Sequence, residues 1–141
     1  MTTLKLFCKY AILMLIGGVI YGLIELCARG YTHWTMIVLG GICFISVGAI
    51  NEHFYADTSF LIQMLCGGGI ITLLEFATGY IVNITLCLDV WDYSDECCNI
   101  LGQVCPKYTL FWMLLSGIAI ILDDFLRYKL FDEEKPKYKL F

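Results

Sequence analysis

Four long apolar runs are the feature that most constrains how this chain can fold. They extend from about Phe7 to Leu26, Trp34 to Ile50, Phe60 to Leu86 and Leu110 to Phe125. A helix of roughly 20 apolar residues crosses the ~30 Å hydrocarbon core of a bilayer, and it satisfies its backbone polar groups internally. The chain is 60% hydrophobic and only 16% charged, which is more apolar than ordinary soluble domains. The sequence therefore predicts an all-α integral membrane protein with four transmembrane helices.

The basic residues predict how these helices are oriented. Seven of the nine Lys and Arg residues lie at the start of the first run or after the fourth: Lys5, Lys9, Arg127, Lys129, Lys135, Lys137 and Lys139. Cytoplasmic segments carry the excess of basic residues in membrane proteins. We therefore expect a multi-pass protein of the cell membrane with both termini in the cytoplasm. Residues 1–126 would form the transmembrane domain and residues 127–141 a charged cytoplasmic tail.

A shift of 50 residues aligns the first apolar run with the third. The shift matches a glycine pair and a glutamate in each run, Gly17-Gly18 with Gly67-Gly68 and Glu25 with Glu75. The second and fourth runs show a weaker match. This pattern predicts two parallel helix-hairpin repeats related by an axis along the membrane normal. The alternative is chance similarity, because membrane segments draw on a small set of residue types.

Each of the two matched runs also carries a face of small residues with one carboxylate. Helical spacing puts two sets on one face each: Gly18, Gly22, Glu25 and Arg29, and Gly68, Thr72, Glu75 and Gly79. The glycines on these faces favour close packing between helices.

A carboxylate at the centre of a span costs about 2.5–3.5 kcal/mol on insertion scales. We therefore expect Glu25 and Glu75 to face protein rather than lipid. If the two faces meet, the carboxylates repel each other, and one should bind a proton or a cation. Glu25, Glu75, Arg29 and Thr72 are thus candidates for a substrate or ion site. The alternative is a structural role, with Glu25 paired to Arg29 and Glu75 hydrogen-bonded to Thr or Asn side chains.

The segment between the third and fourth runs is acidic and aromatic. Asp89, Asp92, Asp95 and Glu96 lie within eight residues, as in a cation-gathering mouth, a partner surface or a plain solvated loop. Ser94 suits the N-cap of a short helix that begins at Asp95. Such an interfacial or re-entrant helix would extend toward Gly102 and end before Pro106.

Other functions find little support in the sequence. The net charge of −4 gives no basic footprint for nucleic acid. No Cys or His spacing matches a metal site, so we expect neither a metal nor a cofactor. No nucleophile–base pair indicates an enzyme. The cluster of Cys97, Cys98 and Cys105 leaves a disulfide open.

Three segments of the chain resemble a known family. They are Leu74–Gly79, the run Trp91-Asp92-Tyr93-Ser94, and Asn99–Cys105. Together they resemble the ABC-transporter type IV permease family of Gram-positive bacteria, in which a Leu-Glu-Tyr helix precedes a Trp-Asp-Tyr-Ser motif and an Asn-x-x-Gly segment. The resemblance extends over most of Gly17 to Gly117. The chain departs from the family at Phe76, where Tyr is usual, and in the cysteine-rich Glu96-Cys97-Cys98.

The resemblance implies a membrane component of a bacterial transporter. The positions carried over are Glu75 and the motif residues Trp91, Asp92, Tyr93, Ser94, Asn99 and Gly102. No Walker A sequence is present, so an ATPase would be a separate protein. We expect a permease-like component or a small carrier in the lipid bilayer, working as a homo-oligomer or in a larger membrane complex. A structural or regulatory subunit that binds a larger membrane partner is the alternative.

Overall fold

The computed structural model of this protein describes residues 3–53 and 58–139. Regular structure within them is helical, apart from one isolated bridge between Ile100 and Val104. The elements are α1 (Thr3–Arg29), α2 (Trp34–Gly48), α3 (Ile50–His53), α4 (Phe60–Gly79), the π-helical η1 (Tyr80–Thr85) and α5 (Pro106–Phe131). The predicted all-helical fold is confirmed.

Three helical segments are long and apolar enough to cross a membrane. They are α1, α4 continued by η1, and α5. The exterior of the bundle is correspondingly apolar, with Phe7, Leu73 and Leu4 each more than two-thirds exposed, as expected for a membrane-facing surface. The α2 helix is also apolar, but its 15 residues span only about 22 Å at 1.5 Å per residue. Its crossing of the bilayer therefore stays a prediction.

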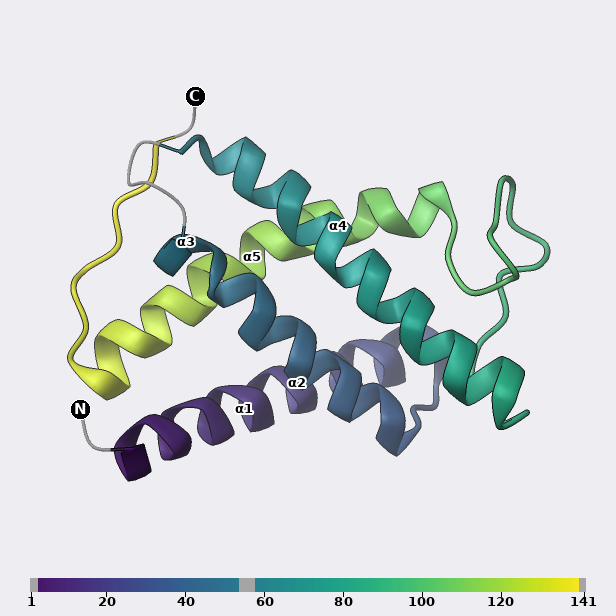
Figure 1. Ribbon diagram of the computed structural model, residues 1–141, viewed down its shortest axis with the longest axis horizontal. Coiled ribbons are helices and arrows are strands. Elements are labelled where there is room, and N and C mark those ends of the chain that lie inside the picture. Colours follow the sequence, from purple (N-terminus) through teal and green to yellow (C-terminus); the bar gives the residue numbers. More distant parts are fainter. Residues whose placement is uncertain (1–2, 54–57, 140–141) are drawn as a thin grey trace.

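The helices pair as two hairpins, α1 with α2 and α4 with α5 (Figure 1). Glycines lie at both contacts. A Cβ at Gly18 would overlap the Ile37 carbonyl oxygen of α2, and one at Gly22 would lie 3.2 Å from the Ile37 side chain. A Cβ at Gly68 would likewise overlap Met113 of α5. These glycines therefore allow the two helices within each hairpin to approach closely.

Both ends of the described chain lie at one end of the bundle (Figure 1). The start of α1, the short α3 and the end of α5 meet there, and the backbone N–H of Phe60 donates to the carbonyl of Lys139 at 2.7 Å. We call this the terminal end. The 30–33 connection and the longer segment of residues 86–105 lie at the opposite, loop end. We call residues 86–105 the cap loop.

The short helix predicted within the cap loop is wrong. No residue of the cap loop is helical, and Cys98 and Leu101 have φ values of 55° and 52°, which a right-handed helix cannot contain. Ser94 donates its hydroxyl to Asp92 at 2.5 Å instead of capping a helix. Pro106 does not end a helix but occupies the first turn of α5, where its missing N–H costs nothing. The α5 helix then runs past Arg127, where the tail was predicted to begin.

Candidate functional site

Glu75 is held deep between the hairpins by two neutral donors. Its side chain is 2% exposed. The Tyr93 hydroxyl donates to Oε1 at 2.9 Å and the Trp112 indole N–H donates to Oε2 at 2.8 Å. None of the ion pairs within residues 3–53 and 58–139 involves Glu75. The carboxylate is therefore hydrogen-bonded but has no cationic partner among the residues that the structure describes.

Aromatic rings surround this carboxylate. Tyr93 stacks on Tyr108 with ring centroids 4.4 Å apart, and Trp112 lies 5.9 Å from Tyr21 by the same measure. Burial and the nearby Glu75 raise the pKa of the Tyr93 hydroxyl. Tyr93 therefore keeps its proton at neutral pH and remains a donor to Glu75.

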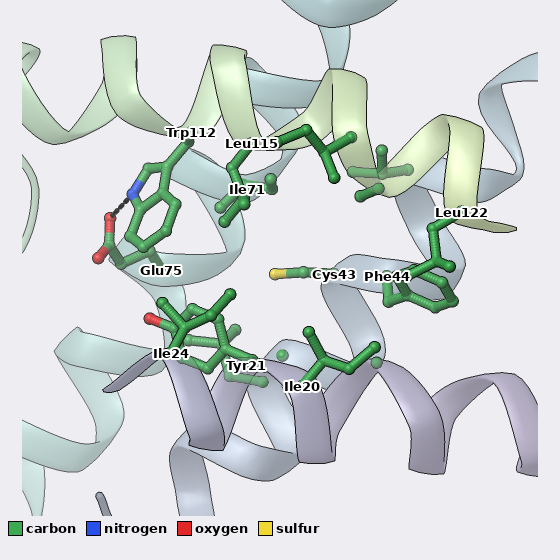
Figure 2. A pocket seen from close by; sticks show the side chains of 16 residues that line it. Ile20, Tyr21, Ile24, Cys43, Phe44, Ile71, Glu75, Trp112, Leu115 and Leu122 are labelled. Carbon is green, nitrogen blue, oxygen red and sulfur yellow. Dashed lines mark hydrogen bonds between the residues drawn. The ribbon is translucent and has the colours of Figure 1, made fainter. Parts of the chain in front are cut away.

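A cavity of about 120 Å³ begins at Glu75 and extends between the hairpins. All four long helices line it, and Glu75 is its one charged lining residue. In Figure 2, Glu75 and Trp112 lie at one end of the cavity, Phe44 and Leu122 at the other, and the Cys43 thiol points in between them. The site is thus an apolar cavity with a single carboxylate at its head.

Glu25, the counterpart of Glu75 in the first hairpin, is held differently. Arg29 donates to its Oε1 at 2.7 Å and Thr32 donates to its Oε2 at 2.6 Å. Arg29 also donates to the Val90 carbonyl at 3.0 Å, which ties α1 to the cap loop. Glu25 is not among the residues that line the cavity. Its charge is therefore compensated within the protein.

The remaining predicted site residue, Thr72, bonds to neither carboxylate. Its hydroxyl donates to Thr109 of α5 at 3.1 Å. The hydrogen-bond partners proposed for a structural Glu75, Thr or Asn side chains, are likewise replaced by Tyr93 and Trp112. Thr72 thus links the two helices of the second hairpin.

A hydrogen-bond chain joins the cap loop to the end of the third apolar segment. Asn83 of η1 accepts from the Val90 N–H at 2.7 Å and donates to Gln103 Oε1 at 2.8 Å. The Trp91 indole donates to the Gln103 carbonyl at 3.0 Å. Trp91 and Gln103 are each 5% exposed. Buried residues therefore anchor the loop, which brings Tyr93 over Glu75.

The other motif residues shape the turn that carries Tyr93. Asp92 Oδ1 accepts from both the N–H and the hydroxyl of Ser94, which lowers the pKa of the Asp92 carboxyl. Asn99 donates to the carbonyl of Ser94 at 3.0 Å and accepts from the N–H of Gly102 at 2.9 Å. Gly102 has φ +68°, and a Cβ there would lie 2.6 Å from Asp92 Oδ1. Only glycine both adopts this left-handed conformation without strain and leaves room for the Asp92 carboxylate.

A second group of charges at the terminal end escaped the sequence analysis. It comprises Lys9, Glu52, Asp123, Asp124, Arg127, Glu133 and Tyr138. Arg127 pairs with Asp123 at 2.5 Å and also with Glu52, and Lys9 pairs with Glu133. The sequence did contain one signal for this group, the i, i+4 spacing of Asp123 and Arg127 at the end of an apolar run. These opposite charges hold the tail against α1 and α5.

All eight cysteines are unpaired, with the sulfur atoms of Cys97 and Cys98 3.5 Å apart. Within the part of the chain that the structure describes, no group of three or more His, Cys, Asp or Glu is placed to hold a metal ion.

Comparison with known proteins identifies the family of this chain. The family model described as "Putative ABC-transporter type IV" matches residues 3–138. No curated protein and no solved structure matches the chain. The matched range includes both carboxylates, the cap loop and all the helices described above.

Proposed function

The chain belongs to the ABC-transporter type IV family, as its motif residues predicted, and from this membership we propose that it is a permease-like membrane component of a transport system. The match covers nearly the whole chain, so it applies to the helices and to the cap loop together. Three long apolar helices agree with a membrane protein of this kind. Glu75 is proposed as the residue that contacts the transported substrate.

The observation that carries the proposal is the uncompensated Glu75. Ionisable groups inside a span are costly, and those that persist mark substrate or ion pathways. Glu25 and Arg29 form the internal pair that a purely structural carboxylate would have. Glu75 has only neutral donors and borders a cavity. It is therefore the carboxylate that remains available to a substrate.

We further propose four crossings of a bacterial cell membrane, with both termini in the cytoplasm and the cap loop outside. The meeting of both described chain ends at the terminal end supports an even number of crossings (Figure 1). The basic residues gathered at that end support a cytoplasmic location. The α2 helix would cross by local thinning of the bilayer.

Equivalent contacts in the two hairpins support the proposed parallel repeat. Gly18 packs on Ile37 as Gly68 packs on Met113, and Gly41 packs on Met14 as Gly117 packs on Met64. Both pairs relate α1 to α4 by a shift of 50 residues and α2 to α5 by a shift of 76. Agreement between two independent contacts favours a duplicated hairpin over chance similarity.

The cavity beside Glu75 is small, about 120 Å³, so a complete pathway would require more protein. We propose that the chain works with a second copy or a larger membrane subunit, and with a separate ATPase at the terminal end. The Gly18 and Gly22 face is occupied by α2, so an oligomer would use other surfaces. The alternative function is a structural or regulatory subunit. The charged group at the terminal end favours it, because paired charges there could bind a larger partner.

Purification from native membranes separates these functions. We expect a tagged chain to bring down an ATPase, and the complex to hydrolyse ATP in liposomes. Glu75→Gln should leave the complex intact but lower transport-coupled hydrolysis at least about tenfold, the change expected if loss of the charge weakens substrate binding by about 1.4 kcal/mol or more. Asp95→Asn, at an exposed position of the cap loop, is the matched control. Recovery with a larger membrane protein and no ATPase would instead establish the subunit function.

A further inference from the structure

We propose that the cavity binds an amphipathic ammonium compound, whose apolar body lies between α1 and α5 and whose ammonium group reaches Glu75. The inference rests on the proposed function and names the substrate class for the same site.

The lining of the cavity argues against a free inorganic cation. Such an ion needs several oxygen ligands to replace its hydration shell, and the lining offers one carboxylate among side chains such as Ile71, Leu39 and Leu115. Apolar cavities of about 150 Å³ stay dry and bind benzene-sized molecules. The cavity of about 120 Å³ therefore suits a hydrocarbon segment better than water or a hydrated ion.

The head of the cavity suits a cation that carries N–H donors. An ionised carboxylate offers about four acceptor positions, and Tyr93 and Trp112 occupy two of those on Glu75. Tyr21 and Trp112 also line the cavity beside it. Aromatic faces attract ammonium groups by cation–π interaction, most strongly where water is excluded.

The first hairpin holds the same combination of groups within the protein. Beside Glu25, the Arg29 guanidinium lies between the carboxylate and the Tyr31 ring, at 2.7 Å from Glu25 Oε1 and 4.6 Å from the ring centroid. A carboxylate, a cation and an aromatic ring are thus all present there. The Glu75 site has the carboxylate and the rings but lacks the cation. A bound ammonium group would supply it.

The opening of the cavity indicates entry from the lipid. Two of its lining residues, Ile20 of α1 and Ile118 of α5, are 36% and 65% exposed on the outside of the bundle. At the loop end, the cap loop closes over Glu75 through Tyr93 and its stack on Tyr108. A ligand that dissolves in the bilayer could therefore enter sideways with its apolar body.

The test uses the full chain in nanodiscs and a bromine-labelled long-chain primary amine, which quenches nearby tryptophan fluorescence. A Trp34→Phe background removes the exposed tryptophan. It leaves Trp112, which lines the cavity and reports on it, and Trp91, which is not among the lining residues and gives a constant background. We expect saturable quenching. Glu75→Gln should weaken the affinity at least about tenfold, and Ala119→Leu, which fills the cavity, should weaken it similarly. Ala77→Leu, on the exposed face of α4, is the matched control and should change nothing.

Three results would overturn the proposal. The first is that a bromine-labelled carboxylate of the same chain length binds as tightly as the amine. The second is that ethylammonium, which lacks the long apolar body, competes as well as an unlabelled long-chain amine. The third is that Ala119→Leu binds the amine as tightly as the native chain. A second chain would be the occupant if the amine caused no quenching and a crosslinking reagent joined α1 of one copy to α5 of another. Amine binding without a co-purifying ATPase would keep this site and reject the proposed function. A complex whose ATP hydrolysis depends on Glu75 but which binds no amine would keep the proposed function and reject the amine as its substrate.

Discussion

The two hairpins place a carboxylate at equivalent positions but compensate it in different ways. In the first, Arg29 lies one turn after Glu25 and pairs with it. In the second, the position that matches Arg29 is Gly79, where a Cβ would overlap Gln103 Oε1 and lie 2.8 Å from the Trp91 ring. The cap loop thus occupies the space that a cationic side chain would need. The carboxylate of the first hairpin is thus paired with a cation, whereas that of the second is held by the neutral donors Tyr93 and Trp112.

The connections of the two hairpins explain this difference. The first hairpin turns within residues 30–33, with Gly30 at φ +77°, and its carboxylate must find partners nearby. The second turns through the 20-residue cap loop, which is long enough to return Tyr93 to Glu75. The family motif lies in that loop. Its residues therefore act by building the cover of the Glu75 site.

Removal of Arg29, the cation that pairs with Glu25, should have the largest effect on the difference between the hairpins. We expect Arg29→Ala to lower the free energy of unfolding by about 3 kcal/mol, because it leaves a largely buried carboxylate unpaired. The double variant Glu25→Gln/Arg29→Gln should recover most of this loss, since it removes both charges. Chemical unfolding in detergent measures both. A stability unchanged by Arg29→Ala would show that Glu25 needs no cation and would remove the contrast between the hairpins.

A smaller effect is expected where the cap loop meets α4. Gly79→Ala should cost about 1–3 kcal/mol, the range for overpacking a well-packed core, because its Cβ meets Gln103 and Trp91. Gly69→Ala is the matched control in the same helix. No atom lies within 4 Å of its Cβ position, so we expect no loss of stability. Equal stability of the two variants, measured by the same unfolding assay, would contradict tight docking of the loop.

The smallest effect concerns the turn beneath Tyr93. The hydrogen bonds from Ser94 hold the pKa of Asp92 below its ordinary value. A carboxyl with a lowered folded-state pKa stabilises the fold above its unfolded pKa of about 3.9 and loses that stabilisation as the pH falls further. The protection of the Gly102 amide, measured relative to its intrinsic exchange rate at each pH, should therefore fall below about pH 4 in the native chain. In Asp92→Asn this protection should not respond to the titration, and a persistent response would assign it to another group.

The sequence predicted the parts of this molecule that depend on local spacing. Apolar runs located the long helices, and the i, i+4 spacing of Glu25 and Arg29 identified their pairing as one alternative. The motif marked the cap loop as important. Its conformation was missed because the turn depends on Asn99 and on left-handed residues such as Cys98, whereas Ser94 followed by two acids resembles a helix start.

Partners distant in the sequence could not be predicted. Tyr93 and Trp112 lie 18 and 37 residues from Glu75, and only packing of the second hairpin brings them together. The pairing of Lys9 with Glu133 joins residues 124 apart. Glu25 and Glu75 were expected to converge if their small-residue faces met. Instead, Gly18 and Gly68 each pack within their own hairpin, and each carboxylate has its own partners.

The claim that Glu75 is the available carboxylate can be tested by chemical modification. An apolar carbodiimide, added to the chain in bilayers, reaches carboxyl groups that open to the lipid and converts them to stable adducts, which peptide mass spectrometry locates. We predict an adduct on Glu75 and none on Glu25, with protection of Glu75 by a long-chain tertiary amine, which cannot itself couple to the activated carboxyl group. Modification of Glu25 in preference to Glu75 would contradict the contrast between the two hairpins.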